Sequence, residues 1–310
     1  MRCVWLWCIN NRRVVQTALA LVLIWDCGGV HADTSAPWFR GVASAVIPGA
    51  GQAGNGDYPE AAMHFGIFAV SVYGALHYQN QSDYLDADER YDEDNNREFI
   101  NKTTLRYDYA ARLATDVTLY SGYAAYRDAR LRDNAGFRTP APRESLSDLA
   151  VAPFSFKFLA RPTTFIPLAI DAALLYRYKD SKDAYGIYRA KDVSQRDLQI
   201  FNLTANEMTA VGEEAFFRGF LNNEFSNRFG DGWGLATSST IFGLAHSGLG
   251  QSANSLQAAL AGAYFGWLHQ RNGFQTGEGV ALHYWINVLA GISAIHNGGR
   301  AELLHVQLPF

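Results

Sequence analysis

Two adjacent carboxylates inside an apolar segment are the first residues of this sequence whose types suggest chemistry. Glu213 and Glu214 are followed by Arg218 in the run VGEEAFFRGFL. A buried carboxylate is unfavourable unless it is paired, and Arg218 lies one helical turn after Glu214, where the two can form an ion pair. Glu213 then lies on a neighbouring face of the helix, where its carboxylate can act as a general base. A purely structural ion pair would account for Glu214 and Arg218 but would leave Glu213 unexplained.

Two later apolar segments carry histidines at the same one-turn spacing from a second side chain. His246 follows Phe242 by four residues, and Asn287 follows His283 by four. Each pair therefore lies on one face of its helix. A single histidine in such a segment is more often a hydrogen-bonded core residue than a ligand. The prediction of a reactive site depends on the three segments together.

The three motifs Glu-Glu-x-x-x-Arg, Phe-x-x-x-His and His-x-x-x-Asn resemble the signature of the CAAX-protease and bacteriocin-processing (CPBP) family in their order, spacing and apolar setting. The resemblance covers roughly residues 150–296. It implies an all-helical intramembrane endopeptidase whose site opens into a water-filled cavity. Such an enzyme hydrolyses peptide bonds with an activated water, so the expected partners are a peptide or protein substrate and membrane lipid.

The family resemblance also implies a role for each residue. Glu213 would be the base, and His246 would share the water. Glu214 and Arg218 would position that water, and the oxyanion would be stabilised by His283 and Asn287. The family has also been described as metalloprotease. Glu213, His246 and His283 could hold a zinc ion with one open position, although the chain contains no His-Glu-x-x-His helix. Zinc is therefore expected as a cofactor only if the reaction depends on a metal.

Apolar, helix-like stretches separated by breaks must position these residues, so the expected fold class is all-α. It is a polytopic membrane helix bundle with a core like that of CAAX prenyl endopeptidases in the C-terminal half. Residues 59–78 have the length of one bilayer crossing. A weaker span at 109–126 is interrupted by Arg112 and Asp116, which must face protein or water. Further stretches follow at 149–178, 201–225, 233–248, 254–270 and 279–296.

The beginning of the chain is typical of an export signal. Arg12 and Arg13 precede an apolar run, and small residues end it near Ala32, so residues 1–32 are predicted to be a signal peptide or an uncleaved first membrane helix. Such a leader favours the bacterial inner membrane. Three further segments are predicted: an N-terminal membrane-associated module with an acidic loop at 33–130, a linker at 131–148 and the CPBP-type protease domain at 149–310.

Composition excludes several other classes of protein. The formal net charge is only -4 over 310 residues, so no nucleic-acid partner is expected. All three cysteines lie in the leader, which excludes a thiolate metal site or a cysteine nucleophile in the mature chain. Acidic residues gather at 83–98, but this stretch lacks the glycine and the terminal glutamate of an EF-hand. A solvated loop is the favoured interpretation there.

Three alternatives remain open at this point. An immunity or scaffold protein of the same family would keep the helices without cleaving peptides. An ion or proton pathway could use the same buried acids and histidines. The mean hydropathy of -0.11 is low for a protein buried in lipid, which keeps ordinary buried helices as an alternative to membrane spans.

Overall fold

The computed structural model describes residues 36–296, apart from 93–96, 134–135, 179–184 and 247–251. The predicted leader with its three cysteines lies outside the described residues, as does the end of the predicted protease domain after residue 296.

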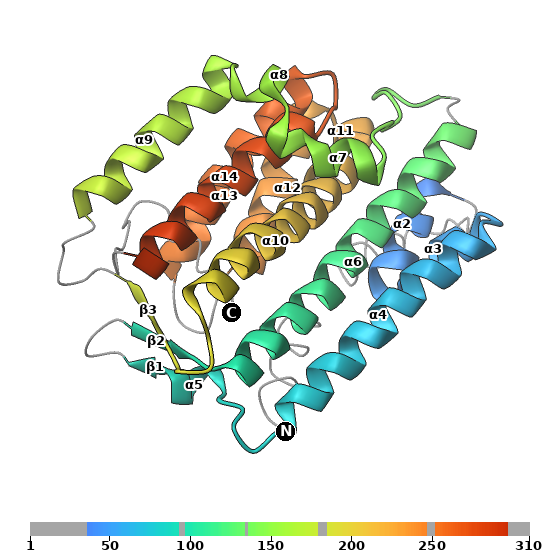
Figure 1. Cartoon of the computed structure of the whole chain (residues 1–310). Helices are drawn as coiled ribbons and strands as arrows, with labels where there is room; N and C mark the ends of the chain where they lie inside the picture. Colours follow the sequence, from blue (N-terminus) through green and yellow to red (C-terminus); the bar gives the residue numbers. More distant parts are fainter. Residues whose placement is uncertain (1–35, 93–96, 134–135, 179–184, 247–251, 297–310) are drawn as a thin grey trace. The chain divides into compact units, whose positions relative to one another are not determined.

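Helices make up most of the described chain, as Figure 1 shows, so the mostly helical fold class is confirmed. In the first half they are α2 (Pro37–Val46), α3 (Ala50–Gly54), α4 (Tyr58–Gln79), α5 (Ala87–Arg90) and α6 (Lys102–Arg132). In the second half they are α7 (Leu146–Val151), the 3-10 helix η1 (Ala152–Phe154), α8 (Phe156–Leu159), α9 (Pro162–Tyr178), α10 (Gln195–Glu213), the π-helix η2 (Glu214–Asn222), α11 (Asn223–Phe229), α12 (Asp231–Ala245), α13 (Ser252–Arg271) and α14 (Gly277–His296).

The helices follow the predicted apolar stretches, with two differences. The stretch 149–178 is broken into four helices because Pro153 and Pro162 lie at helix starts. The predicted span at 109–126 is the middle of the longer helix α6. Within the described part of the chain, no helix combines the length and the apolar composition that crossing a membrane requires.

The described chain divides into two compact units, and each is built from three segments. Unit 1 contains residues 36–66, 118–143 and 215–275, and unit 2 contains residues 67–117, 144–214 and 276–296. In unit 2, α14 packs between α10 and α9 (Figure 1). Helix α10 starts at a capping box, in which Ser194 Oγ accepts from the Asp197 N–H at 3.1 Å and the Asp197 carboxylate accepts from the Ser194 N–H at 2.8 Å.

A small three-stranded sheet in unit 2 was not predicted. Strand β2 (Arg97–Ile100) pairs with β1 (Tyr91–Asp92) in antiparallel and with β3 (Gly186–Arg189) in parallel orientation. The expectation of a solvated loop over 83–98 is therefore wrong in part. Glu98 is buried, and it pairs with Arg90 at 2.9 Å and accepts a hydrogen bond from Tyr185. These partners compensate the charge of Glu98 in the interior.

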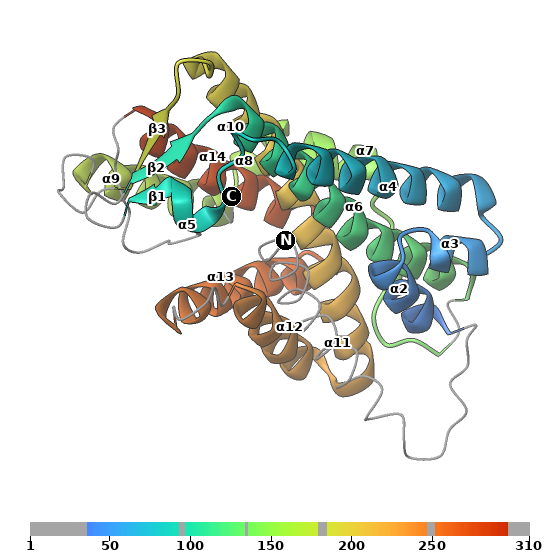
Figure 2. The ribbon, with the colours of Figure 1, turned by 90° about the horizontal axis from the view of Figure 1, so that it is seen from below.

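Unit 1 contains a group of packed helices and a glycine-rich turn. Figure 2 shows α11, α12 and α13 as neighbours, and contacts join α11 to α12 and α12 to α13. A glycine-rich turn lies between α2 and α3, where Gly49 has a φ of 91° that favours glycine. Next to it, Gln52 is buried, accepts from Ser44 at 2.6 Å and donates to the carbonyl of Ser121 at 3.0 Å. This turn is a structural feature with satisfied polar groups.

Candidate active site

The two adjacent glutamates lie where α10 ends and η2 begins. Glu213 is the last residue of α10 and Glu214 is the first residue of the π-helix. π-Helical segments are rare and occur frequently at functional sites. Solvent reaches the Glu213 side chain, which is 16% exposed, whereas the Glu214 side chain is fully buried. Of the two side chains, Glu213 is therefore the one that solvent reaches, although its Oε2 atom is buried.

The ring of His283, on α14, contacts both glutamates. Its Nδ1 lies 2.8 Å from Glu214 Oε1, and its Nε2 lies 3.8 Å from Glu213 Oε2. Because an ionised carboxylate only accepts hydrogen bonds, the Glu214 contact places a ring proton on Nδ1, so that in the neutral ring Nε2 carries the lone pair. Nε2 and the Glu213 carboxylate are too far apart for a direct hydrogen bond, yet they are close enough to bind one water molecule together.

The side chain of Asn287 lies one turn after His283 on the same helix. It is 1% exposed, and neither its amide nitrogen nor its amide oxygen has a hydrogen-bond partner among the residues that the structure describes. Buried amides are normally hydrogen-bonded, because leaving one unpaired is unfavourable by about 1–3 kcal/mol. An unpaired buried amide one turn from His283 is consistent with a group that binds a ligand during the reaction.

Arg218 and His246, the other predicted site residues, lie in unit 1 with Phe242. Arg218 is buried: its guanidinium lies 4.2 Å from the Phe242 ring centroid, and its Nη2 donates to the carbonyl of Gly262 at 3.3 Å. The ring centroids of Phe242 and His246 are 4.3 Å apart, so the two side chains lie together at the end of α12, where His246 is the first residue after the helix. Nδ1 of His246 lies 2.8 Å from the carbonyl oxygen of Phe242 and donates to it, so that Nε2 carries the lone pair in the neutral ring.

Within unit 2, His283 contacts both Glu213 and Glu214, and Asn287 lies one turn after His283 on α14. The pairing of Glu214 with His283 was not predicted, because the sequence suggested Arg218 as the partner of Glu214. The predicted ion pair between Glu214 and Arg218 stays a prediction. The signal for the observed pair lies in the packing of α10 against α14, which no local spacing in the sequence reveals.

The histidine tautomers suit a zinc ion as well as a water molecule. Metal-binding histidines usually donate their second ring N–H to a carboxylate or a backbone carbonyl. His283 does so to Glu214 and His246 does so to Phe242, and in both rings Nε2 is then the nitrogen that can bind a metal. Two histidines and a carboxylate are donor types found at catalytic zinc sites.

Comparison with known proteins agrees with the motif assignment. Residues 199–289 match the family model described as type II CAAX prenyl endopeptidase Rce1-like. We call this segment the Rce1-like region. The match confirms the predicted resemblance to the CPBP family, and the Rce1-like region includes all six predicted site residues. No curated protein and no solved structure shows significant similarity to the chain.

Proposed function

We propose that the chain is a membrane-associated endopeptidase in which Glu213 activates a water molecule for attack on a peptide bond. The observation that carries this proposal is the contact of His283 with both glutamates. Buried Glu214 orients the ring, and Nε2 lies 3.8 Å from the Glu213 carboxylate. A carboxylate and a lone pair that face each other at this distance can accept both protons of one water molecule.

In the proposed reaction, Glu213 takes a proton from the water while His283 Nε2 accepts the second hydrogen bond. The oxygen attacks the carbonyl carbon of the peptide, and negative charge develops on the carbonyl oxygen. The buried amide N–H of Asn287 is a suitable donor to that oxyanion. The C–N bond then breaks as the carbonyl re-forms from the oxyanion, and Glu213 passes its proton to the leaving amine, so that two peptide products form. This assignment gives His283 the role of an acceptor and Asn287 that of the oxyanion donor.

The family resemblance supports further roles for His246 and Arg218, as a second ligand of the water and as a positioning charge. If the enzyme depends on zinc, Glu213, His246 and His283 would hold the ion, which would supply Lewis acidity for the attacking water. A chelator therefore has to be part of any activity test.

Exposed apolar side chains support the membrane location. Helix α9 presents several of them to solvent: Phe165, Ile166, Ile170 and Tyr176. Exposed apolar surface on a protein often marks a site that binds another protein or a membrane. With the leader that the sequence predicts, it favours membrane lipid as the partner of this surface.

The proposal is tested by cleavage of a quenched peptide library with purified full-length protein in detergent. Glu213→Gln should reduce kcat by at least about 100-fold, because the general base is lost. Glu207→Gln is the matched control, since Glu207 lies on the same helix but two turns before the site. Each protein is assayed with and without 1,10-phenanthroline, and its zinc content is measured.

The outcomes separate the alternatives. Loss of activity in Glu213→Gln with full activity in Glu207→Gln supports the proposal, and sensitivity to the chelator decides whether zinc takes part. A wild-type protein that cleaves no peptide would favour a family member with an immunity or scaffold role. Transport of ions in reconstituted vesicles without proteolysis would favour a pathway function.

A further inference from the structure

Two charged residues buried on α6 lie outside the Rce1-like region. Arg112 is 7% exposed and Asp116, one turn later, is 6% exposed. As the sequence predicted, both face protein. Burying two charges is costly unless they are paired and hydrogen-bonded, so their partners indicate what they are for.

Both residues contact the same hydroxyl on α10. Arg112 Nη1 donates to Thr209 Oγ1 at 3.1 Å, and Thr209 Oγ1 donates to Asp116 Oδ2 at 3.1 Å. Thr209 itself is buried. The hydroxyl of a single threonine therefore connects the positive and the negative charge of α6 to α10.

Thr209 lies one turn before Glu213, and the backbone around it is held close to α6. Gly212 is the residue directly before Glu213, and a Cβ atom there would lie only 3.0 Å from the carbonyl oxygen of Asp116. The charge of Glu213 also interacts with those of Arg112 and Asp116. The turn of α10 that carries Glu213 is therefore fixed against α6 by a close backbone approach and by the Thr209 hydrogen bonds.

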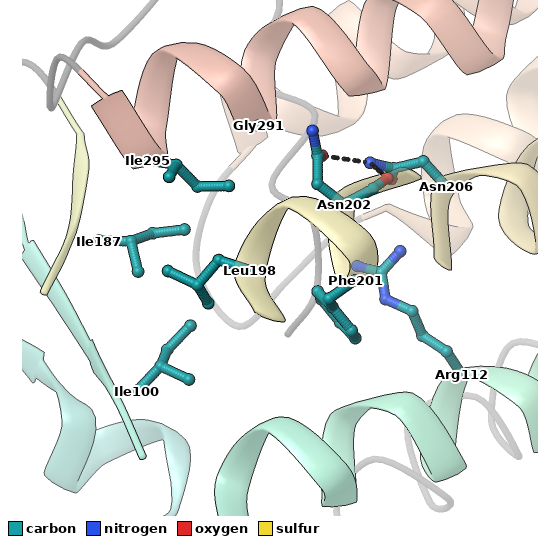
Figure 3. Close-up of a pocket in the computed structure, with 9 residues that line it drawn as sticks. All are labelled: Ile100, Arg112, Ile187, Leu198, Phe201, Asn202, Asn206, Gly291 and Ile295. Atoms are coloured by element: carbon teal, nitrogen blue, oxygen red, sulfur yellow. Dashed lines mark hydrogen bonds between the residues drawn. The ribbon is translucent and has the colours of Figure 1, made fainter. Parts of the chain in front are cut away.

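The same face of α10 is also tied to α14, the helix that carries His283. Asn206 donates to Asn202 Oδ1 at 2.7 Å, and Asn202 donates to the carbonyl of Val288 at 3.0 Å. Figure 3 shows both asparagines with Arg112 at a small cavity of about 10 Å³, room for about one water molecule. Asn202, Asn206, Thr209 and Glu213 follow one another at spacings of four, three and four residues, which places them on one helix face.

We propose that Arg112, Asp116 and Thr209 are positioning residues for Glu213, so that the N-terminal part of the chain completes the active site of the Rce1-like region. The inference rests on the proposed endopeptidase function. The Thr209 hydroxyl is held between the two charges. It thereby fixes the last turn of α10 and, with that turn, the position of the Glu213 carboxylate. If these three residues had a purely structural role, their loss would affect folding stability and leave turnover by the folded enzyme unchanged.

The test compares Thr209→Val, which removes the hydroxyl and keeps the shape, with Thr209→Ser, which keeps the hydroxyl. Thr204→Val is the matched control, because the Thr204 hydroxyl donates to the Ile200 carbonyl of its own helix at 2.8 Å. We expect kcat for peptide cleavage to fall about tenfold in Thr209→Val with little change in KM, since a misplaced base slows the chemical step. Thr209→Ser and Thr204→Val should retain wild-type kcat.

A double-mutant cycle of Thr209→Val with Asp116→Asn measures how strongly the two substitutions are coupled in kcat. A purely structural role would leave kcat of the folded enzyme unchanged. If Thr209 and Asp116 act on Glu213 as one unit, their effects on log kcat will be far from additive, whereas independent effects would add. Thermal unfolding of each variant confirms that the folded enzyme is assayed. Full kcat in Thr209→Val beside an active wild type would overturn this inference alone. An inactive wild type would overturn it together with the proposed function.

Discussion

Asn287 keeps both polar atoms of its side chain buried without a hydrogen-bond partner among the described residues, which is unfavourable for the folded state. We expect Asn287→Leu to raise the free energy of unfolding by about 1 kcal/mol, since an apolar side chain of similar size removes the unpaired amide. The same substitution should lower kcat about 100-fold, because an oxyanion donor is lost. Urea unfolding and steady-state kinetics measure the two effects.

Asn202→Leu is the matched control for that prediction. Asn202 is also buried but hydrogen-bonds to Val288 and Asn206, so its replacement should lower the free energy of unfolding by about 1–3 kcal/mol. If Asn287→Leu were less stable than the wild type and fully active, Asn287 would be an ordinary core residue.

Glu214 gives a second prediction at the residue scale. Glu214→Gln keeps an oxygen that can accept from His283 Nδ1 but removes the charge that fixes the ring proton there. We expect kcat to fall about 10- to 100-fold, as is usual when the partner behind a functional histidine is changed. Proton NMR of the His283 ring should show a changed Nδ1–H signal. An unchanged kcat would mean that Glu214 acts only in folding.

Phe242 and His246, which the sequence placed one turn apart, do lie side by side, because four-residue spacing brings two side chains to one side of an α-helix. The same spacing from Glu214 to Arg218 falls within the π-helix η2, which has a different period. The contact between Glu214 and His283 joins residues 69 positions apart and depends on which helices pack together. Local spacing carries no information about that choice.

At the scale of elements, Gly243 allows α12 to approach α13 closely. A Cβ atom at Gly243 would lie 2.6 Å from the carbonyl oxygen of Ser255 and 2.7 Å from Ala259 Cβ. Because the first contact is with backbone, Gly243→Ala should lower the free energy of unfolding by about 1–3 kcal/mol, measured by urea unfolding. Gly66→Ala, where nothing lies within 4 Å, should be neutral or stabilising. Equal effects at the two positions would contradict the close packing.

Glu144 accepts from the backbone N–H groups of Thr276 and Gly277 at the start of α14. Burial raises the pKa of Glu144 above its ordinary value of 4.5, while these two N–H groups act in the opposite direction. The folded protein therefore binds this proton more readily than the unfolded chain. The stabilising contribution is fully present below the ordinary pKa and is lost as the pH rises through the raised value.

We therefore expect the wild type to lose stability relative to Glu144→Gln as the pH rises from about 4 to about 8. The measurement is the difference in free energy of unfolding between the two proteins at each pH. Glu89→Gln, at an exposed position, should show no such trend. A difference that grows in favour of the wild type with rising pH would contradict the direction of the Glu144 shift.

The elements that the sequence did not predict are short and depend on distant partners. Strand β1 has two residues and lies in an acidic stretch, so neither its length nor its hydrophobicity signals a strand. β2 forms only because β3 pairs with it from 89 positions later, in the register of Arg97 with Gly186. The long helices, in contrast, carry their own signal in apolar runs between breaks.

At the scale of the whole molecule, the exposed apolar side chains of α9 predict binding to lipid. We expect the full-length protein to stay with membranes after alkaline carbonate extraction. Purified protein should bind phosphatidylcholine vesicles, and Ile166→Asn combined with Ile170→Asn should weaken that binding, because apolar area is removed from the contact. Tyr188→Asn, at an exposed aromatic on the sheet, is the control. Equal binding by the double variant and the wild type would exclude α9 as the contact surface.

The π-helix η2 has a consequence for anyone who engineers this protein. Its hydrogen bonds span one residue more than those of an α-helix, so nine residues from Glu214 to Asn222 are wound at a different period from α10. A helical wheel drawn at 3.6 residues per turn therefore misassigns the faces after Glu214. Deleting a single residue within η2 would allow the segment to rewind as an α-helix, and the side chains of this segment would be redistributed over its faces. Alignments that place a gap in this segment thus describe a change of shape as well as of length.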